Sequence, residues 1–512
     1  MQQGVLPIQC EVERAGMQTT ARGGLLPYLD LMTKLGLWEL AGRLVAARNG
    51  AQGWTDGQHV AAAVLLNLAG GGCVDDLAAL EADTGLGALV RQAEVQGMSR
   101  KERRAFERRH RKGRARAFPS ASAARRYLEA SHDGSYEAGR ETALAAGVKA
   151  YIPTPNAALR GLMELNAAVV AKVLLWAPLS VATLDMDATL VESAKAAALY
   201  CYKHFTAFQP LNVWLAERQL MVWSEFRDGN VPAGHEQLRV FQAALEHMPS
   251  SVGKVRLRSD SAGYQWELLK YCAEGKHARF GVIDFAVSAD VTTEFRQAVQ
   301  ETPSDAWQSL VRRADGMELE TDQEWAEVCF VPNEVGHKKG GPAYRFLAIR
   351  EPLRQLELPG VEQKQQALPF PVIEQGGVKY KLFGVVTNLE LPGDEVIWWL
   401  RERCGKSEEA HSIMKSDLAG GTLPSGLFGA NAAWWQMMIL AFNINAAMKH
   451  LVLGGTWAAR RLKALRFGFI NVVGRIVHHA RHLVMKLAGG RETTELIIGA
   501  RQRILALAPS SG

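Results

Sequence analysis

Two aspartates stand two positions apart in an apolar stretch of the sequence, and a third ends a similar stretch further on. Asp185 and Asp187 lie in "TLDMDAT", and Asp260 closes "VRLRSD". On a strand, residues two apart point to the same face. An open α/β sheet places ligand-binding groups at the ends of its strands, and carboxylate oxygens are the ligands of hard divalent cations. These residues therefore predict a shared metal site, although each aspartate alone is equally typical of a turn cap.

A further carboxylate, Glu408, lies in the helical run "RCGKSEEAHSIMKSDL". Lys415 follows seven residues later, which is close to two helical turns, so both side chains share one helix face. The same spacing is typical of a solvated Glu–Lys pair, and Glu409 competes with Glu408 for the same role.

Strands must position the aspartates, and the sequence predicts them after Pro178. Three β-branched and aromatic runs are followed by a helical segment, a strand, a second helical segment and a further strand, all within residues 176–300. This order predicts an α/β core. The patterns then indicate a β-rich insertion at 301–392, helices that complete the core at 393–450, and a basic helical tail at 451–512.

Residues 1–175 are rich in Ala, Leu, Arg and Glu at helical spacing, so we expect an all-helical N-terminal region. Thr55 or Asp56 is placed to cap one of its helices, and Pro119 with Ser120 is placed to start another.

Positive charge is concentrated in this N-terminal region. The 512 residues include 59 Lys and Arg against 53 Asp and Glu, a formal net charge of +6, with 48% hydrophobic and 22% charged residues. Such a composition excludes collagen-like and disordered chains. Residues 100–116 hold ten basic residues and two glutamates, so this stretch alone carries +8. It is a candidate contact for a phosphate backbone, with a solvated charged linker as the alternative.

The six cysteines are far apart and lack metal-binding spacing, which predicts free thiols in a reducing compartment. The N-terminus shows no signal-peptide pattern, and the most apolar runs are too short or too polar to span a bilayer. We therefore expect a cytoplasmic protein with no membrane association. The pairs Trp398–Trp399 and Trp434–Trp435 are expected in the core, with base stacking as the alternative, and the histidines of "HHARH" on the surface.

Taken together, these residues resemble the Asp-Asp-Glu (DDE) transposases of bacterial insertion sequences. Asp187 is followed by Thr189, Asp260 precedes "SAGY", and Glu408-x6-Lys415 matches the end of the Tyr-x2-Arg-x3-Glu-x6-Lys signature of one group. The segments "LDMDATLVESAK", "EFRDGN" and "CGKSEEAHSIMKSDLAGGTLPSGLFGANAAWW" are similar to one subgroup of it.

Two features depart from this signature. Trp399 stands near the place of its Tyr, and the gap from Arg403 to Glu408 is one residue longer than the pattern. The resemblance covers Ala182–Met448. It implies an RNase H-like core in which the first two carboxylates lie on adjacent strands and the third on a helix after an insertion, with an N-terminal helical region that binds DNA.

The resemblance also implies metal-dependent cleavage of DNA, in which two Mg²⁺ (or Mn²⁺) ions activate the attacking oxygen and stabilise the leaving one. The implied catalytic and metal-binding residues are Asp187, Asp260 and Glu408, with Asp185 and Glu409 as alternates. Asp187 is preferred over Asp185 because the family's first Asp typically precedes a Thr by two positions. The candidate DNA-binding residues are Arg403, Lys415, Arg103, Arg104, Arg108, Arg109, Arg111, Lys112, Arg125 and Arg126.

The function that the resemblance implies is cut-and-paste transposition by an enzyme that binds its terminal inverted repeats and its target DNA. Because two DNA ends must be paired, a homodimer or higher oligomer is expected. Two alternatives remain open: an RNase H-like nuclease or resolvase without strand transfer, and a non-catalytic DNA-binding protein derived from a transposase. The same carboxylates would serve the nuclease, so the motifs do not separate it from a transposase.

Overall fold

The computed structural model describes residues 18–48, 53–111, 116–148, 150–314, 317–330, 332, 344–353, 370–479 and 482–508, without the side chains of residues 109–111, 314 and 482. Lys112, Cys10 and the side chains of Arg109 and Arg111 lie outside this description.

Helices dominate the described part of the N-terminal region, after a short strand β1 (Gln18–Thr20). Their bounds are α1 (Leu25–Lys34), α2 (Leu37–Leu44), α3 (Asp56–Ala69), α4 (Leu77–Glu81), α5 (Thr84–Glu94), α6 (Arg100–Arg111), α7 (Ala121–Glu129), α8 (Ser135–Ala145) and α9 (Ala157–Trp176). Thr55 and Gln58 form a capping box that begins α3 at the predicted place. Ser120 accepts a hydrogen bond from the Ala123 N–H and so caps α7, as predicted.

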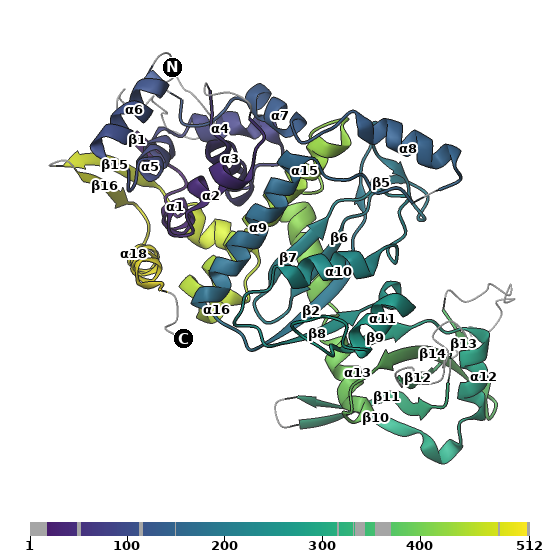
Figure 1. The fold of residues 1–512 in the computed structure, drawn as a ribbon. Helices are drawn as coiled ribbons and strands as arrows, with labels where there is room; N and C mark the ends of the chain where they lie inside the picture. Colours follow the sequence, from purple (N-terminus) through teal and green to yellow (C-terminus); the bar gives the residue numbers. More distant parts are fainter. Residues whose placement is uncertain are drawn as a thin grey trace, which may run out of the picture.

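A ten-stranded sheet runs from the centre of the molecule into its lower right-hand part (Figure 1). Five of its strands are β2 (Val181–Ala188), β6 (Leu211–Leu215), β7 (Leu220–Glu225), β8 (Lys254–Ser259) and β9 (Asp284–Ala289), in the order β7-β6-β2-β8-β9. β6 is antiparallel to both of its neighbours, whereas β8 is parallel to β2 and to β9. Helices α10 (Gln237–Glu246) and α11 (Trp266–Ala273) make the crossovers that the parallel strands require. The predicted order is confirmed for these five strands and two helices, whereas three short strands between β2 and β6 were not predicted.

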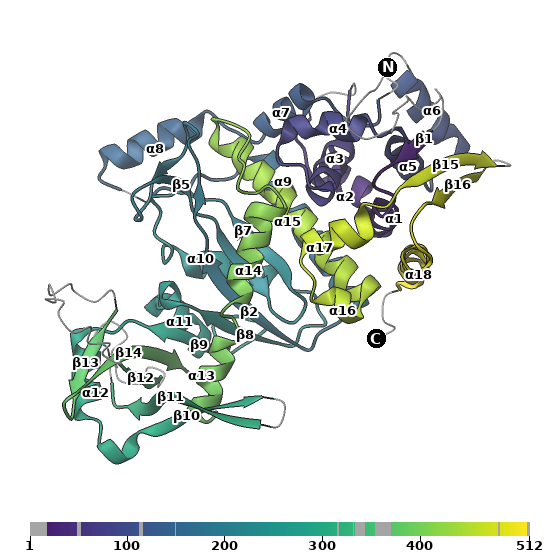
Figure 2. The same cartoon turned by 180° about the vertical axis from the view of Figure 1, so that it is seen from behind.

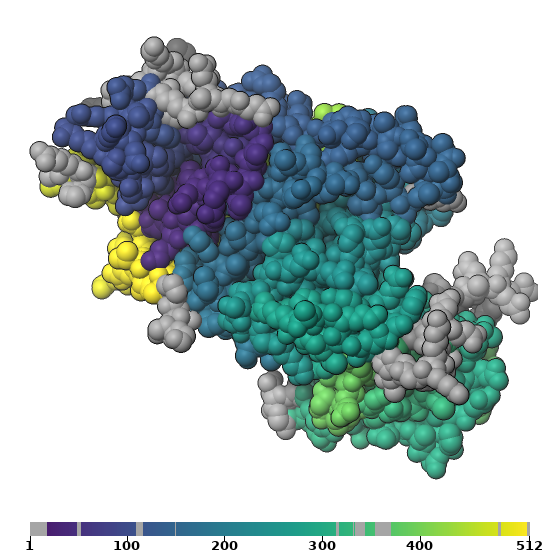
Figure 3. Space-filling model, viewed as in Figure 1, coloured from purple at the N-terminus to yellow at the C-terminus, as the bar shows by residue number. Residues whose placement is uncertain are grey.

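The β-rich insertion extends this same sheet. After α12 (Thr293–Glu301) come β10 (Gln308–Ala314), β11 (Met317–Val328), β12 (Arg345–Pro352), β13 (Val372–Gln375) and β14 (Val378–Thr387), followed by α13 (Gly393–Arg401). β14 pairs antiparallel with β9, so the sheet continues as β9-β14-β12-β11-β10. In space-filling view these elements form a lobe at the lower right of the molecule (Figure 3). Because β14 pairs directly with β9, the lobe is anchored to the edge of the core sheet.

Two smaller elements flank the end of β2. A separate three-stranded sheet follows it, with strands β3 (Val191–Glu192), β4 (Leu199–Tyr200) and β5 (Thr206–Phe208) in the order β3-β5-β4. Helix α14 (Lys406–Ser412) continues as a π-helical turn, Ile413–Asp417.

Helix α15 (Phe428–Ala447) is buried along its whole length and lies between the N-terminal helices and the core sheet (Figure 2). Asn443 accepts a hydrogen bond from the Met221 N–H at 2.7 Å, and its amide donates to Asn166 Oδ1 at 2.7 Å. Since a buried polar network is stable only when its members are paired, these bonds fix α15 between β7 and α9.

The C-terminal segment differs from the predicted helical tail. A π-helical turn (Met448–Leu453), the short helices α16 (Gly455–Ala458) and α17 (Leu462–Leu465), and another π-helical turn (Arg466–Ile470) lead to a hairpin of β15 (Gly474–His479) and β16 (His482–Leu487), and then to α18 (Arg491–Ala506). The prediction of helix across 474–487 is wrong. β15 alternates buried and exposed residues at its start, and β1 pairs with it antiparallel, so a strand partner more than 450 residues away decides the conformation.

The described cysteines are free thiols, as expected: Cys73, Cys201, Cys272, Cys329 and Cys404. Among the helices described, none is by itself long and apolar enough to cross a membrane; one bent pair, Asp56–Ala69 with Val74–Glu81 at 97°, meets that test jointly.

Candidate active site

Asp187 and Asp260 lie at the same edge of the core sheet. Asp187 is next to last in β2, and Asp260 directly follows β8, the strand parallel to β2. The registers place Met186 opposite Ser259, and the Ser259 hydroxyl donates to the Met186 carbonyl at 3.2 Å. Asp260 is held by a hydrogen bond from the Ala262 N–H, 3.1 Å from its Oδ1. The two strand ends thus bring together carboxylates that are 73 residues apart in the sequence.

Glu408 and Arg403 approach Asp187 from the helical segment that follows the insertion. The Arg403 guanidinium lies 3.3 Å from Asp187 Oδ2, and Arg403 is only 8% exposed. Burial raises the pKa of Asp187 to about 7; Arg403 opposes this shift, whereas the nearby charges of Asp260 and Glu408 add to it. Asp187 therefore lies among two further carboxylates and one buried cation.

Asp185 forms an ion pair with a different arginine, Arg258. Its carboxylate accepts two hydrogen bonds from Arg258, at 2.7 and 3.0 Å, and both side chains are 2% exposed. Arg258 also donates to the carbonyl of Trp399 at 2.7 Å and to Glu402 at 3.1 Å. The ion pair thereby ties β2 and β8 to α13, the helix that leads to Arg403.

The two adjacent glutamates of α14 face different neighbours. Glu408 is among the charges that act on Asp187, whereas Glu409 acts on Lys449. Residues next to each other on a helix point about 100° apart, which explains the separation. The structure therefore brings Glu408, and not Glu409, to the aspartates.

The extra residue between Arg403 and Glu408 lies in a break between two helices. α13 ends at Arg401, and α14 begins at Lys406 after Gly405, whose φ is +79°. A glycine adopts this left-handed conformation without a Cβ clash. A turn therefore accommodates the longer spacing, and the signature need not fit one continuous helix.

His411 and Lys415 complete the surroundings of Asp187. His411 Nδ1 is 3.9 Å from Asp187 Oδ2, and its Nε2 lies 3.3 Å from the Asn212 amide. Burial, with smaller contributions from Lys415 and Arg403, lowers the pKa of His411 to about 3. Lys415 donates to the Leu190 carbonyl at 3.3 Å. His411 was not among the residues expected at the site from the sequence; its place three residues after Glu408, on the same helix face, was the available signal.

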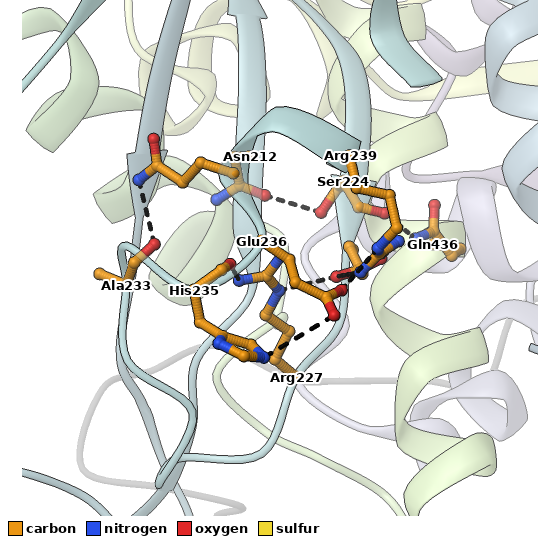
Figure 4. Close-up of polar contacts among 10 residues, drawn as sticks. Asn212, Ser224, Arg227, Ala233, His235, Glu236, Arg239 and Gln436 are labelled. Carbon is orange, nitrogen blue, oxygen red and sulfur yellow. Dashed lines mark hydrogen bonds and ion pairs between the residues drawn. The ribbon is translucent and has the colours of Figure 1, made fainter. Parts of the chain in front are cut away.

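The "EFRDGN" segment forms a buried ion cluster after β7 (Figure 4). Arg227, 1% exposed, donates to Glu225 at 2.7 Å and to the carbonyl of His235 at 2.7 Å. Arg239 donates two further hydrogen bonds to Glu225, at 2.6 and 2.9 Å. Burial by itself would raise the pKa of Glu225, but the two guanidinium groups lower it overall.

The loop that this cluster fixes reaches the turn after Asp260. A Cβ added at Gly234 would lie 2.9 Å from the Ala262 carbonyl, so a glycine is needed for this approach. The motif thus supports the backbone that carries Asp260.

The basic cluster of the sequence forms an exposed helix. Ser99 and Glu102 cap the start of α6, and the described basic side chains of this helix, Arg103, Arg104 and Arg108 among them, lie at the surface. α6 lies at the upper left of Figure 1, away from the strands that carry the aspartates. In α7, Arg125 is paired with Asp75, whereas Arg126 is exposed.

Of the two tryptophan pairs, Trp434–Trp435 lies in the core, as expected, whereas Trp398 and Trp399 are only partly buried. Trp434 and Trp435 are 2% and 0% exposed, and their indole N–H groups donate to the Ala419 carbonyl and the Ser224 hydroxyl. Trp398 donates to the Val311 carbonyl at 2.7 Å.

The oxygen ligands of the site fit a hard divalent cation. Within the described ranges, no three His, Cys, Asp or Glu side chains already meet in metal-binding geometry. Glu408 Oε2 accepts a hydrogen bond from the Gly405 N–H at 2.6 Å, which holds this carboxylate at the start of α14.

Comparison with known proteins identifies a family. The family profile described as "Transposase DDE domain group 1" matches residues 5–509 of the chain. A solved structure of the piggyBac transposase, in a synaptic complex with hairpin DNA, is similar at 10% sequence identity and a TM-score of 0.43, over 89% of this chain and 83% of that one. No match was found among curated proteins.

Proposed function

Since the chain belongs to the family "Transposase DDE domain group 1", we propose that it is a DNA transposase that binds the terminal inverted repeats of its element and moves it by cut-and-paste. The observation that carries this proposal is the approach of Asp187, Asp260 and Glu408 to one another from three separate elements, with Arg403 beside them. Such a cluster of carboxylates is costly for stability, which favours a functional reason for it.

We infer that the core is RNase H-like. This inference is supported by the strand order β7-β6-β2-β8-β9. In that order β7, β6 and β2 pair antiparallel, whereas β8 pairs parallel with both β2 and β9. The first carboxylate lies on the central strand β2, the second follows β8, and the third lies on α14 after the insertion. This is the placement that the sequence resemblance implies.

Asp187, Asp260 and Glu408 are the residues that would hold two Mg²⁺ or Mn²⁺ ions. When bound, such ions activate the attacking oxygen and stabilise the leaving oxygen of a phosphodiester. Because the pKa of Asp187 is raised to about 7, Asp187 has to lose its proton before it acts as a ligand. Arg403 favours that ionisation from 3.3 Å.

Positive groups around this site suit a DNA strand. The hydrogen bond from Lys415 to the Leu190 carbonyl is long, at 3.3 Å, and a phosphate oxygen can replace that acceptor. The Arg403 guanidinium contacts Asp187, so its contact with a phosphate group is a prediction. The exposed α6 adds sequence-independent attraction to the DNA backbone.

We further propose that the enzyme works as a homodimer or higher oligomer, because cut-and-paste movement pairs two ends of one element. Because the proposed substrate is DNA, we place the enzyme in the bacterial cytoplasm, at the nucleoid.

The test is a cleavage assay on a plasmid that carries the coding region with its flanking genomic DNA. We expect the wild-type protein, with MgCl₂, to cut at inverted repeats and to insert pre-cut ends into target DNA. Asp187→Ala, Asp260→Ala and Glu408→Ala should abolish cutting while DNA binding, measured by gel shift, is kept.

The same assay separates the alternatives. Cutting without insertion of pre-cut ends would identify a nuclease or resolvase. DNA binding without metal-dependent cutting would identify a non-catalytic derivative, and either result would overturn the proposal.

A further inference from the structure

Two tyrosines project from the hairpin that joins β4 and β5. Tyr200 is 61% exposed and Tyr202 is 67% exposed, whereas Cys201 between them is 3% exposed. Among the large hydrophobic side chains that the structure describes as exposed, Phe467 is the one other aromatic residue with more than half of its surface exposed. Tyr200 ends β4 and Tyr202 lies in the turn that follows, so both phenol rings reach solvent from this hairpin while the buried Cys201 anchors it.

The hairpin holds these rings on a rigid turn. Tyr200 pairs with Thr206, the Cys201 N–H donates to the Phe205 carbonyl at 2.8 Å, and the His204 N–H donates to the Cys201 carbonyl at 3.0 Å. His204 closes the turn with a φ of +67°. A tight turn followed by a left-handed residue is a common short hairpin loop. The loop therefore presents Tyr202 and Lys203 in a fixed position.

Positive charge accompanies the rings and leads toward the carboxylates. Lys203 Nζ lies 5.8 Å from the centre of the Tyr202 ring. Lys203 is also near enough to Lys415 to lower its pKa, after the larger effect of burial. Lys415 in turn contacts Leu190, three residues after Asp187. The hairpin tip thus lies beside the basic side of the candidate active site.

Exposed aromatic rings next to lysines are the chemistry that binds unpaired nucleotides. Bases stack on aromatic faces whatever their sequence, and ammonium groups contact the adjoining phosphates. Trp434 and Trp435 cannot serve in this way without unfolding the core, because they are 2% and 0% exposed. Blunt duplex DNA offers stacked and paired bases and gains little from such a surface.

We propose that Tyr200 and Tyr202 form a stacking platform for unpaired bases of the DNA strand next to the cleavage site, with Lys203 contacting the phosphate. This inference rests on the proposed function, since DNA is the partner it assumes. Its specific claim is a preference for DNA ends with unpaired bases.

The experiment compares two probes: a short blunt duplex, and the same duplex with a single-stranded overhang that contains a fluorescent adenine analogue. Wild-type protein should bind the overhang probe more tightly than the blunt one and quench its fluorescence. Tyr200→Ala with Tyr202→Ala should weaken overhang binding by about tenfold per stacked base, which is equivalent to about 1.4 kcal/mol each, and leave blunt binding unchanged.

Two matched variants control for ring chemistry and for exposure. Tyr200→Phe with Tyr202→Phe keeps the rings and should bind as the wild type does, and Phe467→Ala removes an exposed ring elsewhere. Equal overhang affinity in the Ala and Phe double variants, or an equal loss in Phe467→Ala, would overturn the platform while leaving the transposase proposal intact. Failure of the wild type to bind either probe would overturn both.

Discussion

The strongest prediction concerns the Asp185/Asp187 doublet, because the structure gives its two members opposite surroundings. We consider Asp185→Asn, which keeps the shape of the side chain and removes its charge. Asp185 and Arg258 are both 2% exposed and are joined by two hydrogen bonds of 2.7 and 3.0 Å. Removing one partner of a buried ion pair costs about 3–5 kcal/mol, since the other charge stays buried.

Arg258 keeps two contacts in this variant. The carbonyl of Trp399, at 2.7 Å, and the carboxylate of Glu402, at 3.1 Å, continue to accept its hydrogen bonds. We therefore expect a loss near the lower end of the range, about 3 kcal/mol of unfolding free energy. Replacing both partners, as Asp185→Leu with Arg258→Met, removes the stranded charge and should restore most of that loss.

The matched variant is Asp187→Asn, two residues along the same strand. The pKa of Asp187 is raised to about 7, chiefly by burial, so its ionised form opposes folding in the metal-free protein. Each pKa unit corresponds to about 1.4 kcal/mol. A neutral Asn removes this cost but weakens the partner of the buried Arg403, so the net change in stability should be much smaller than in Asp185→Asn, and cleavage should be abolished by the loss of a carboxylate ligand.

Urea unfolding followed by tryptophan fluorescence at neutral pH without metal measures the first effect, and Mg²⁺-dependent cleavage at a temperature where both variants are folded measures the second. Asp185→Asn should be destabilised yet active, and Asp187→Asn should change much less in stability yet be inactive. An Asp185→Asn variant that unfolds at the same urea concentration as the wild type, or an Asp187→Asn variant that still cuts DNA, would contradict these roles.

Three further predictions follow from the same structure. Glu408→Gln should abolish cleavage and Glu409→Gln should not, because only Glu408 is among the charges that act on Asp187; equal losses in the plasmid assay would contradict this placement. Burial raises the pKa of Glu94 to about 7, against a hydrogen bond from Gln58, so folded Glu94 holds its proton more tightly than unfolded Glu94. Its contribution to stability is then complete below its ordinary pKa and is lost as pH rises through about 7; urea titrations should show a decline that is smaller in Glu94→Gln than in the wild type, by at most about 3 kcal/mol, with Asp187 causing part of what remains. Finally, Arg104→Gln with Arg108→Gln in α6 should reduce the salt dependence of DNA binding by about one slope unit per lost phosphate contact, and an unchanged slope in a binding titration would exclude α6 from the interface.

Local patterns in the sequence predicted much of the architecture. The alternation of strands and helices in 176–300 depends on short-range periodicity, and the caps at Thr55 and Ser120 depend on a single side chain and the N–H groups two or three residues ahead. The hairpin of β15 and β16 escaped prediction because its conformation depends on pairing with β1, at the other end of the chain.

For the candidate site, too, the sequence predicted one part and left another part open. The sequence alone identified the carboxylates, since their spacing and the family signature are one-dimensional properties. It left Asp185 against Asp187 and Glu408 against Glu409 open, because neighbouring residues of one type differ only in what surrounds them.

Tertiary structure placed Arg258, which lies on another strand, against Asp185, and Arg403, from beyond the insertion, against Asp187. Which carboxylate is neutralised in the core and which lies at the shared edge of β2 and β8 is thus an outcome of packing. Burial and nearby charge depend on which residues lie close together in the folded protein, and the order of residues along the chain does not specify this.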